Sequence, residues 1–117
     1  MKIIRAEAKD WQEGADYFKK ILLDATDLKA GNFLIQEIRM KSGVRAKIHH
    51  HDNQTELFYL INNNGYFIVN NENIRLEVGD ILLVNVGEKH TVANESGEEF
   101  KFLAMKLSYD KDDTIID

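Results

Sequence analysis

Four histidines and one glutamate are the residues of this chain best suited to chemistry. His49, His50 and His51 are consecutive, Glu56 follows in the same segment, and His90 is the only other histidine. Successive side chains of a β-strand point to opposite faces, so His49 and His51 share a face and His50 points away from it. A turn through the polar residues in between would bring Glu56 over the two imidazoles. Imidazoles with a carboxylate suit first-row divalent metals such as Mn, Fe, Co, Ni or Zn.

A metal site is one of two interpretations of this segment. Adjacent histidines in a polar loop are usually exposed to solvent and bind nothing specific. The sequence KIHHHDNQTE alone does not decide between the two interpretations. His90 by itself, in the sequence GEKHTVAN, has the alternative role of an ordinary polar residue at the start of a strand. The two segments therefore have to be considered together.

Together, the two segments resemble the pair of sequence motifs of the cupin superfamily. The first motif is matched by Gly43-x5-His49-x-His51-x4-Glu56. The second is matched by Gly79-x7-Gly87-x2-His90-x3-Asn94. A lone His-x-His would be weak support, whereas two motifs in the right order, at the right internal spacing, are specific. The resemblance is to small, single-domain microbial cupins, and it covers residues 43–94.

The chain departs from these motifs at two positions. Asn63 stands where the first motif has a glycine, and Asn85 stands where the second has a proline. Asparagine is the usual second choice, after glycine, for left-handed backbone, and a proline would only stiffen a turn. Neither position supplies a ligand, so the departures affect the turns and leave the ligand positions intact.

The resemblance implies an all-β fold, the double-stranded β-helix, in which two antiparallel sheets form a barrel. It also implies that four side chains converge inside that barrel and hold one divalent transition metal: His49, His51, Glu56 and His90. The metal would be Mn, Fe, Zn, Ni or Co. Four buried polar groups are costly unless they are satisfied, and a divalent cation satisfies them together.

Side chains near these ligands are candidates for lining a mostly apolar pocket. Strand alternation places Phe58 and Leu60 on the same face as Glu56. It places Val92 and Asn94 on the same face as His90. Two more lie on opposite faces of the segment NFLIQEIRM, only one of which can be inward. The candidates are Gln36, Arg39, Phe58, Leu60, Val92 and Asn94. Phe58 and Leu60 have the alternative role of plain barrel core.

Four further side chains have two open roles each. Arg45 and Lys47 precede His49 by an even number of residues, so strict alternation would aim both into the barrel as an anion clamp. The alternative, which we favour, is an irregular and exposed approach loop. Tyr59 and Tyr66 would contribute either to the pocket or to the surface of a dimer.

The rest of the sequence indicates the elements that position these groups. From Asn32 onward, short apolar segments alternate with clusters of Asn, Gly and Asp, a pattern typical of an all-β sandwich or barrel. The sequences NNNG and NNEN each lie between apolar runs and predict tight hairpins. We expect one cupin domain over residues 1–117, with the barrel core at about 32–108.

The two ends of the chain are less regular. Within the N-terminal extension, residues 1–31, the segment Tyr17–Leu23 fits either a strand or an amphipathic helix, and Gly14 favours the strand. The acidic tail, residues 109–117, is predicted to be loose, although Ile115 and Ile116 are able to dock on a neighbouring surface.

Composition limits the possible partners. The chain has 117 residues and a formal net charge of −5, so nucleic acid and anionic membranes are not expected as partners. It has no cysteine, which excludes disulfides, thiolate nucleophiles and cysteine-based zinc sites. No apolar run has the length of a signal peptide or a membrane span, so a cytoplasmic location is expected. Exposed apolar strands and the N-terminal extension predict a homodimer.

Three functions remain open from the sequence. The first is a metal-dependent enzyme acting on a small polar molecule, by dioxygenase-like oxidation or by isomerisation. The sequence shows no general acid or base beyond the metal ligands, which favours oxidation over isomerisation. The second function is a non-catalytic module that binds a small carboxylate or sugar, and the third is a cupin whose metal is structural.

Overall fold

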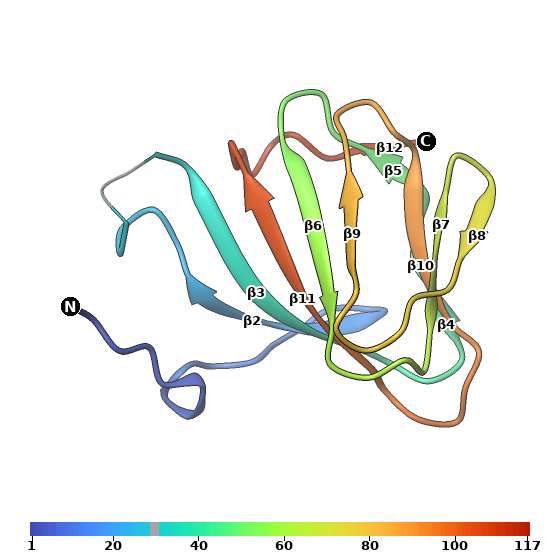
Figure 1. Ribbon diagram of the computed structural model, residues 1–117, viewed down its shortest axis with the longest axis horizontal. Coiled ribbons are helices and arrows are strands. Elements are labelled where there is room, and N and C mark those ends of the chain that lie inside the picture. Colours follow the sequence, from blue (N-terminus) through green and yellow to red (C-terminus); the bar gives the residue numbers. More distant parts are fainter. Residues whose placement is uncertain (29–30) are drawn as a thin grey trace.

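Two antiparallel sheets pack face to face and enclose the core, as Figure 1 shows. The computed structural model describes residues 1–28 and 31–117. The first sheet has the order β1 (Gln12–Glu13), β2 (Tyr17–Leu23), β3 (Phe33–Met40), β11 (Phe100–Leu107), β6 (Thr55–Leu60) and β9 (Ile81–Val84). The second has the order β12 (Ile115–Ile116), β5 (His49–His50), β10 (His90–Asn94), β7 (Tyr66–Val69) and β8 (Glu72–Ile74), with β4 (Val44–Arg45) also paired to β10. A 3-10 turn, η1 (Ala6–Ala8), precedes the strands.

The winding of the chain is that of a double-stranded β-helix, which confirms the predicted fold class. After β3, the chain passes from one sheet to the other and back, so strands that are neighbours in a sheet are distant in sequence. β11, for example, lies between β3 and β6, with Phe102 opposite Ile38 on one side and Leu60 on the other. This winding brings the two histidine-containing segments, β5 and β10, side by side in one sheet.

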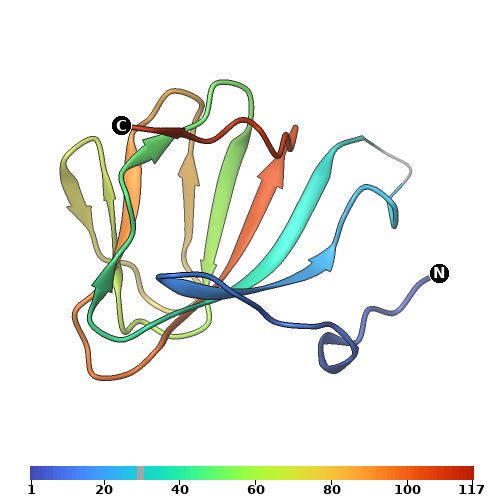
Figure 2. The ribbon, with the colours of Figure 1, turned by 180° about the vertical axis from the view of Figure 1, so that it is seen from behind.

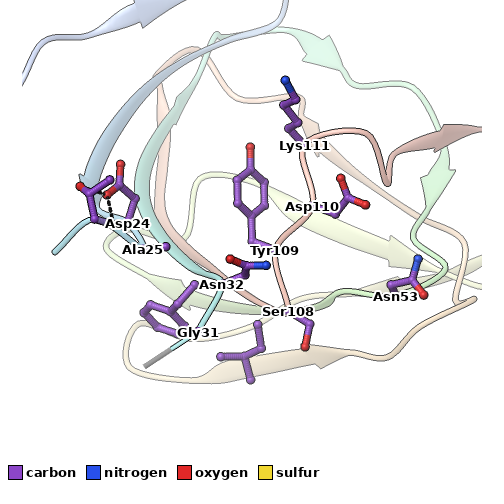
Figure 3. A pocket seen from close by; sticks show the side chains of 12 residues that line it. Asp24, Ala25, Gly31, Asn32, Asn53, Ser108, Tyr109, Asp110 and Lys111 are labelled. Atoms are coloured by element: carbon purple, nitrogen blue, oxygen red, sulfur yellow. Dashed lines mark hydrogen bonds between the residues drawn. The ribbon is translucent and has the colours of Figure 1, made fainter. Parts of the chain in front are cut away.

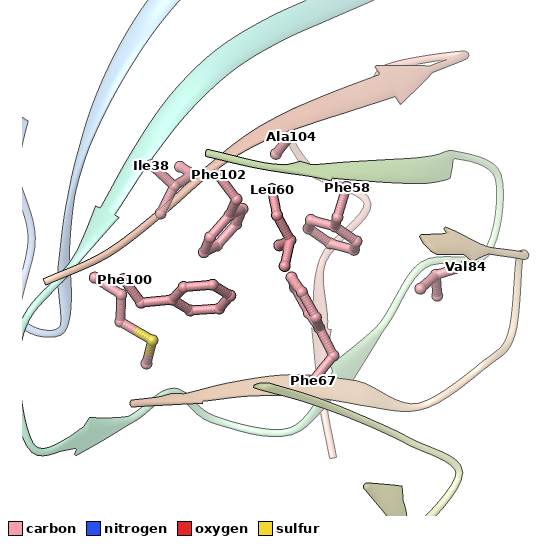
Figure 4. Close-up of a cluster of buried hydrophobic side chains, with 9 residues drawn as sticks. Ile38, Phe58, Leu60, Phe67, Val84, Phe100, Phe102 and Ala104 are labelled. Carbon is pink, nitrogen blue, oxygen red and sulfur yellow. The ribbon is translucent and has the colours of Figure 1, made fainter. Parts of the chain in front are cut away.

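Aromatic and aliphatic side chains fill one half of the space between the sheets. Figure 4 shows Phe67 reaching from the second sheet towards Phe58, Leu60 and Phe102 of the first. The ring centroids of Phe67 and Phe102 are 5.3 Å apart, and those of Phe100 and Phe102 are 4.9 Å apart, distances typical of favourable aromatic pairs. The polar cluster of His49, His51, Glu56 and His90 lies in the other half of the barrel.

The two asparagine-rich turns have different roles. The hairpin predicted at NNEN is confirmed, because β7 and β8 pair across it and Asn70 and Asn71 adopt left-handed φ values of 48° and 66°. The hairpin predicted at NNNG is wrong, because β6 and β7 belong to different sheets. There, the amides of Asn62 and Asn64 both donate to the Glu99 carbonyl, at 3.1 and 2.9 Å. These bonds tie the crossover to the loop before β11.

The segment Tyr17–Leu23 is a strand, as predicted. It pairs with β3 from Tyr17 opposite Met40 to Leu23 opposite Ile35, with a register shift after Ile21, so it extends the first sheet. Its alternation places Tyr17 on the inner face of the sheet, beside Met40. Residues 29 and 30 of the expected N-terminal extension lie outside the described residues.

The acidic tail crosses the end of the barrel that carries the histidines. Figure 2 shows it, in dark red, running from β11 along the upper end of the molecule to β5. Ile115 pairs with His50 and Ile116 with His49, which confirms the docking of these two isoleucines. The prediction of a loose tail is therefore wrong for its last residues.

Candidate metal centre

Four polar side chains converge at the end of the barrel opposite the aromatic core. One ligand atom from each of His49, His51, Glu56 and His90 lies within 4.8 Å of the others. They come from the end of β5, the start of β6 and the start of β10, where His90 is directly opposite His49. Three of the four are buried, and His49 is half-buried. The predicted cluster is therefore assembled as the resemblance implied.

Backbone carbonyl groups fix the orientation of all three imidazoles. The Nδ1 atom of His49 lies 3.0 Å from the Lys47 carbonyl, and that of His90 lies 2.9 Å from the Glu88 carbonyl. The Nδ1 atom of His51 lies 2.7 Å from the Asp113 carbonyl. A carbonyl only accepts, so Nδ1 carries the hydrogen towards each of these carbonyls; in His51 the same atom also lies 2.8 Å from the side-chain amide nitrogen of Gln54. In His49 and His90, Nε2 is then left with its lone pair available to a metal, whereas Nε2 of His51 donates to Oε1 of Glu56, and a metal would replace that proton.

His90 provides the observation that best tests whether a metal fits. Its Nε2 is buried and has no hydrogen-bond partner among the described residues. The nearest acidic oxygen, Oε1 of Glu56, is 3.5 Å away. Buried polar atoms are nearly always paired, because an unpaired one loses its hydration without compensation. Three imidazole Nε2 atoms and one carboxylate match the donor set of a first-row divalent cation, so the residues fit a single metal site.

The electrostatics of the cluster keep the glutamate ionised. Burial acts to raise the pKa of Glu56, but the hydrogen bond from His51 and the contact with His90 outweigh it and hold that pKa well below its usual value. Burial also lowers the pKa of His49, which keeps this imidazole neutral. Burial acts to lower the pKa of His51 as well, yet its bonds to Glu56 and to the Asp113 carbonyl raise it overall. A carboxylate and a neutral imidazole are the forms that bind metals.

The turn between β9 and β10 locks the two halves of the site together. Gly87 has a φ of +79°, in the left-handed region that favours glycine. In this conformation its N–H donates to the His51 carbonyl at 2.8 Å. The N–H of Asn85 donates to the Glu88 side chain at 2.8 Å, so the turn is held without the proline of the motif.

His50 is separate from the cluster, as strand alternation predicted. Its Nδ1 faces the carboxylate of Asp117, with 2.8 Å between the two atoms. That hydrogen bond lowers the pKa of Asp117. His50 thus anchors the tail.

A small cavity of about 90 Å³ lies against the cluster. Three predicted pocket residues, Gln36, Phe58 and Val92, line it. Two further lining residues, Tyr17 and Lys106, did not appear among the sequence-based candidates. Alternation along FKFLAMKL places Lys106 on the face of Phe102 and Ala104, so the signal was present. Lys106 could have been predicted from this alternation only if the inward face of that strand had been known.

Tyr17 and Lys106 bring polar groups to an otherwise mainly apolar wall. The Tyr17 side chain is 37% exposed and also lines the cavity, which places it at the mouth. Burial, followed by the charges of Glu56 and Asp16, raises the pKa of this phenol, so it stays protonated. Lys106 is opposite Glu56 on the neighbouring strand.

Three other predicted pocket residues lie elsewhere. Leu60 is 1% exposed and packs in the aromatic core, which was its alternative role. Arg39 is on the outer face of β3, where it pairs with Glu99 at 2.6 Å and lies over the Trp11 ring. Asn94 shares the face of His90 but lies at the far end of β10, and its amide donates to the Glu98 carbonyl at 2.7 Å.

The approach to the first histidine is irregular, as favoured from the sequence. Arg45 and Lys47 are exposed, and between β4 and β5 it is Ala46 that faces the cavity. The break in alternation between Ala46 and His49 turns both basic side chains outward. Tyr59 is exposed at 39%, and Tyr66 donates to Glu95 at 2.7 Å, so neither lines the cavity.

A second, wider depression lies on the outside of the same end of the molecule. Figure 3 shows its lining side chains, with Asp24 and Ala25 on one side, Asp110 and Asn53 on the other, and Tyr109 and Asn32 between them. It is open to solvent and contains none of the four clustered ligands.

Comparison with known proteins identifies the family. The model of the cupin domain matches residues 36–106, which is more than half of the chain. The chain belongs to the cupin family. An oxalate-binding protein of Thermotoga maritima is 25% identical to this cupin over 72 residues, a match that covers 62% of the chain and 60% of the relative. The match thus spans about three fifths of the length of that relative.

Solved structures of other cupins have the same fold. A predicted oxalate decarboxylase from Thermotoga maritima superposes with a TM-score of 0.78 at 18% identity, covering 91% of this chain and 98% of that one. KdgF from Halomonas sp. has a TM-score of 0.80 at 14% identity, covering 95% of this chain and 98% of that one. The polyketide cyclase RemF from Streptomyces resistomycificus has a TM-score of 0.82 at 15% identity, covering 99% of this chain and 84% of that one. At these identities the likeness establishes the fold.

The described residues contain no helix that is both long and apolar enough to cross a membrane.

Proposed function

We propose that this cupin holds one divalent transition metal and uses it, together with Lys106, to bind a small carboxylate. The observation that carries the proposal is the position of Lys106. It is a basic side chain on the wall of a cavity that His49, Glu56 and His90 of the cluster also line. A metal and an ammonium group at the same cavity attract an anion from two sides.

The cavity also limits the size of the ligand. Its volume of about 90 Å³ suits a molecule of a few non-hydrogen atoms and is well below the roughly 300–1,000 Å³ of pockets for drug-sized ligands. Gln36 and Tyr17 add hydrogen-bonding groups, whereas Phe58 and Val92 supply apolar wall. The curated relative whose name is oxalate-binding protein supports a small carboxylate as the class of ligand.

A metal-dependent enzyme acting on that carboxylate is the second candidate. The observation in its favour is that two side chains outside the metal cluster, Tyr17 and Lys106, line the cavity and can hold or move a proton. A bound metal would supply Lewis-acid chemistry and, if it is Fe or Mn, redox chemistry. The phenol at the mouth would restrict the entry of water and contact the bound carboxylate.

Calorimetric titration with metal-loaded protein tests the proposal. Oxalate and acetate are the charged probes, and oxamide is the neutral probe of similar size. We expect the carboxylates to bind and oxamide to bind at least tenfold more weakly. Lys106→Met should weaken carboxylate binding roughly 10- to 100-fold, the range for losing a hydrogen bond to a charged group. Metal content should stay unchanged.

Lys101→Met is the matched control, because Lys101 is on the same strand but opposite Arg39, on the outer face. Equal affinity for oxalate and oxamide, or full binding by Lys106→Met, would contradict the proposal. Turnover of the bound carboxylate by metal-loaded protein, measured by product analysis, would favour the enzyme over the binding module.

A further inference from the structure

We propose that the acidic tail, residues 109–117, is a positioning element for the metal centre, with Asp113 as the residue that orients the ligand His51. The inference rests on the metal site of the proposed function. It adds a part of the chain that lies outside both cupin motifs, because the tail follows the matched region of residues 36–106.

The side chain of Asp113 holds the loop that joins two ligands. Its carboxylate accepts the backbone N–H groups of three consecutive residues, Asp52 at 2.9 Å, Asn53 at 2.8 Å and Gln54 at 2.9 Å. These residues lie between His51 and Glu56, and Asp113 is itself buried. Successive N–H groups that point at one anion form a concave anion site. The carboxylate therefore fixes the conformation of this loop.

The backbone of Asp113 acts on the ligand directly. Its carbonyl is the acceptor 2.7 Å from His51 Nδ1. The other two imidazoles take their carbonyl acceptors from residues two positions earlier in their own segments, Lys47 and Glu88. Only His51 depends on a distant segment for this bond. The Gln54 side chain also contacts this Nδ1, at 2.8 Å, and is itself held by the N–H of Asp110 in the tail, at 3.3 Å. The orientation of the ring, and hence the direction of its Nε2, therefore depends on the tail.

The last residues of the tail hold the strand that carries His49. β12 adds to the free edge of β5, and the N–H of Asp117 donates to the Ile48 carbonyl at 2.9 Å. The pair formed by Asp117 and His50 closes the same edge. β5 has only two residues and its other neighbour is β10, so the tail provides one of its two flanks.

The tail is held by polar bonds more than by apolar burial. Ile115 and Ile116 remain 37% and 58% exposed, and neither belongs to the hydrophobic core. Segments with few buried apolar contacts open locally at low cost while the core stays folded. Loss of the tail contacts should therefore affect the metal centre before it affects the barrel.

Substitution of Asp113 tests the inference. Asp113→Ala removes the acceptor of three N–H groups, and the affinity for Zn(II), measured by competition with a chelator, is expected to fall 10- to 100-fold, the usual effect of losing a group that orients a ligand. The visible absorption of the Co(II)-loaded protein should change, because the geometry around the metal changes. Asp113→Asn keeps one acceptor oxygen and should lose less affinity than Asp113→Ala.

Asp112→Asn is the matched control, because Asp112 is next to Asp113 but is exposed. This variant should have the metal affinity and the Co(II) spectrum of the wild-type protein. The melting temperature of each metal-free variant separates positioning from folding. Wild-type affinity and an unchanged Co(II) spectrum in Asp113→Asn and Asp113→Ala would overturn the inference, as would a lower metal-free melting temperature with unchanged affinity. A wild-type protein that binds no metal would overturn the proposed function as well, so the two failures are distinguishable.

Discussion

The protonation of His51 links metal binding to pH. In the metal-free protein burial acts to lower its pKa, but the bonds to Glu56 and to the Asp113 carbonyl raise it above the usual value of 6.5. A raised pKa means that the proton stabilises the folded state at pH 6, and that this contribution is lost as the pH rises through the folded-state pKa. A metal has to displace the same proton.

We therefore expect the affinity for the metal to rise from pH 6 to pH 8. Chelator competition at pH 6, 7 and 8 measures this trend. His50→Ala, which lies outside the cluster, should keep the same pH dependence. An affinity that is constant over this range would contradict the assignment of His51 as a protonated partner of Glu56.

At the residue scale, the four clustered side chains could be predicted from the sequence, and the lining of the cavity could be predicted only in part. Alternation and motif spacing were sufficient for His49, His51, Glu56 and His90, because both signals are local. Lys106 was missed because its face is set by pairing with β3 and β6, which are distant in sequence. Asp113 was missed because its partners precede it by 59 to 61 residues.

At the scale of elements, the turns show the same limit. Asparagine pairs indicate left-handed backbone, which is correct at Asn70 and Asn71, but they do not reveal whether the flanking strands share a sheet. At NNNG they do not, because the chain crosses from β6 to β7 in the other sheet. A two-residue strand such as β12 is too short for any periodicity, so only the possibility of docking could be stated.

Among the glycines, Gly65 is the one where an added Cβ would meet the closest neighbours. A Cβ at this residue would lie 2.3 Å from the Phe100 ring and 2.6 Å from the Ala93 carbonyl. The crossover into β7 must therefore move away from a well-packed core, and Gly65→Ala is expected to lower the free energy of unfolding by about 1–3 kcal/mol. Urea unfolding measures this.

The control is Gly97→Ala, where a Cβ would meet nothing within 4 Å. It should have wild-type stability or close to it. Equal stabilities of the two variants would show that the crossover is not as tightly packed as the structure indicates.

At the scale of the whole molecule, the homodimer stays a prediction. Ile81 and Leu83 on β9 are 58% and 50% exposed, and Tyr59 beside them is 39% exposed, so the edge of the first sheet presents apolar side chains to solvent. We expect light scattering at micromolar concentration to give the mass of two chains. The mass of a single chain would contradict the prediction.

The central claim is that four side chains of one chain hold one divalent metal. Elemental analysis of protein prepared without an affinity tag tests it most directly. We expect close to one transition metal per chain, loss of the metal in His51→Ala and His90→Ala, and full retention in His50→Ala. Wild-type protein that still contains no metal after incubation with Mn, Fe, Co, Ni and Zn would contradict the account. Equal losses of metal in all three variants would contradict it as well.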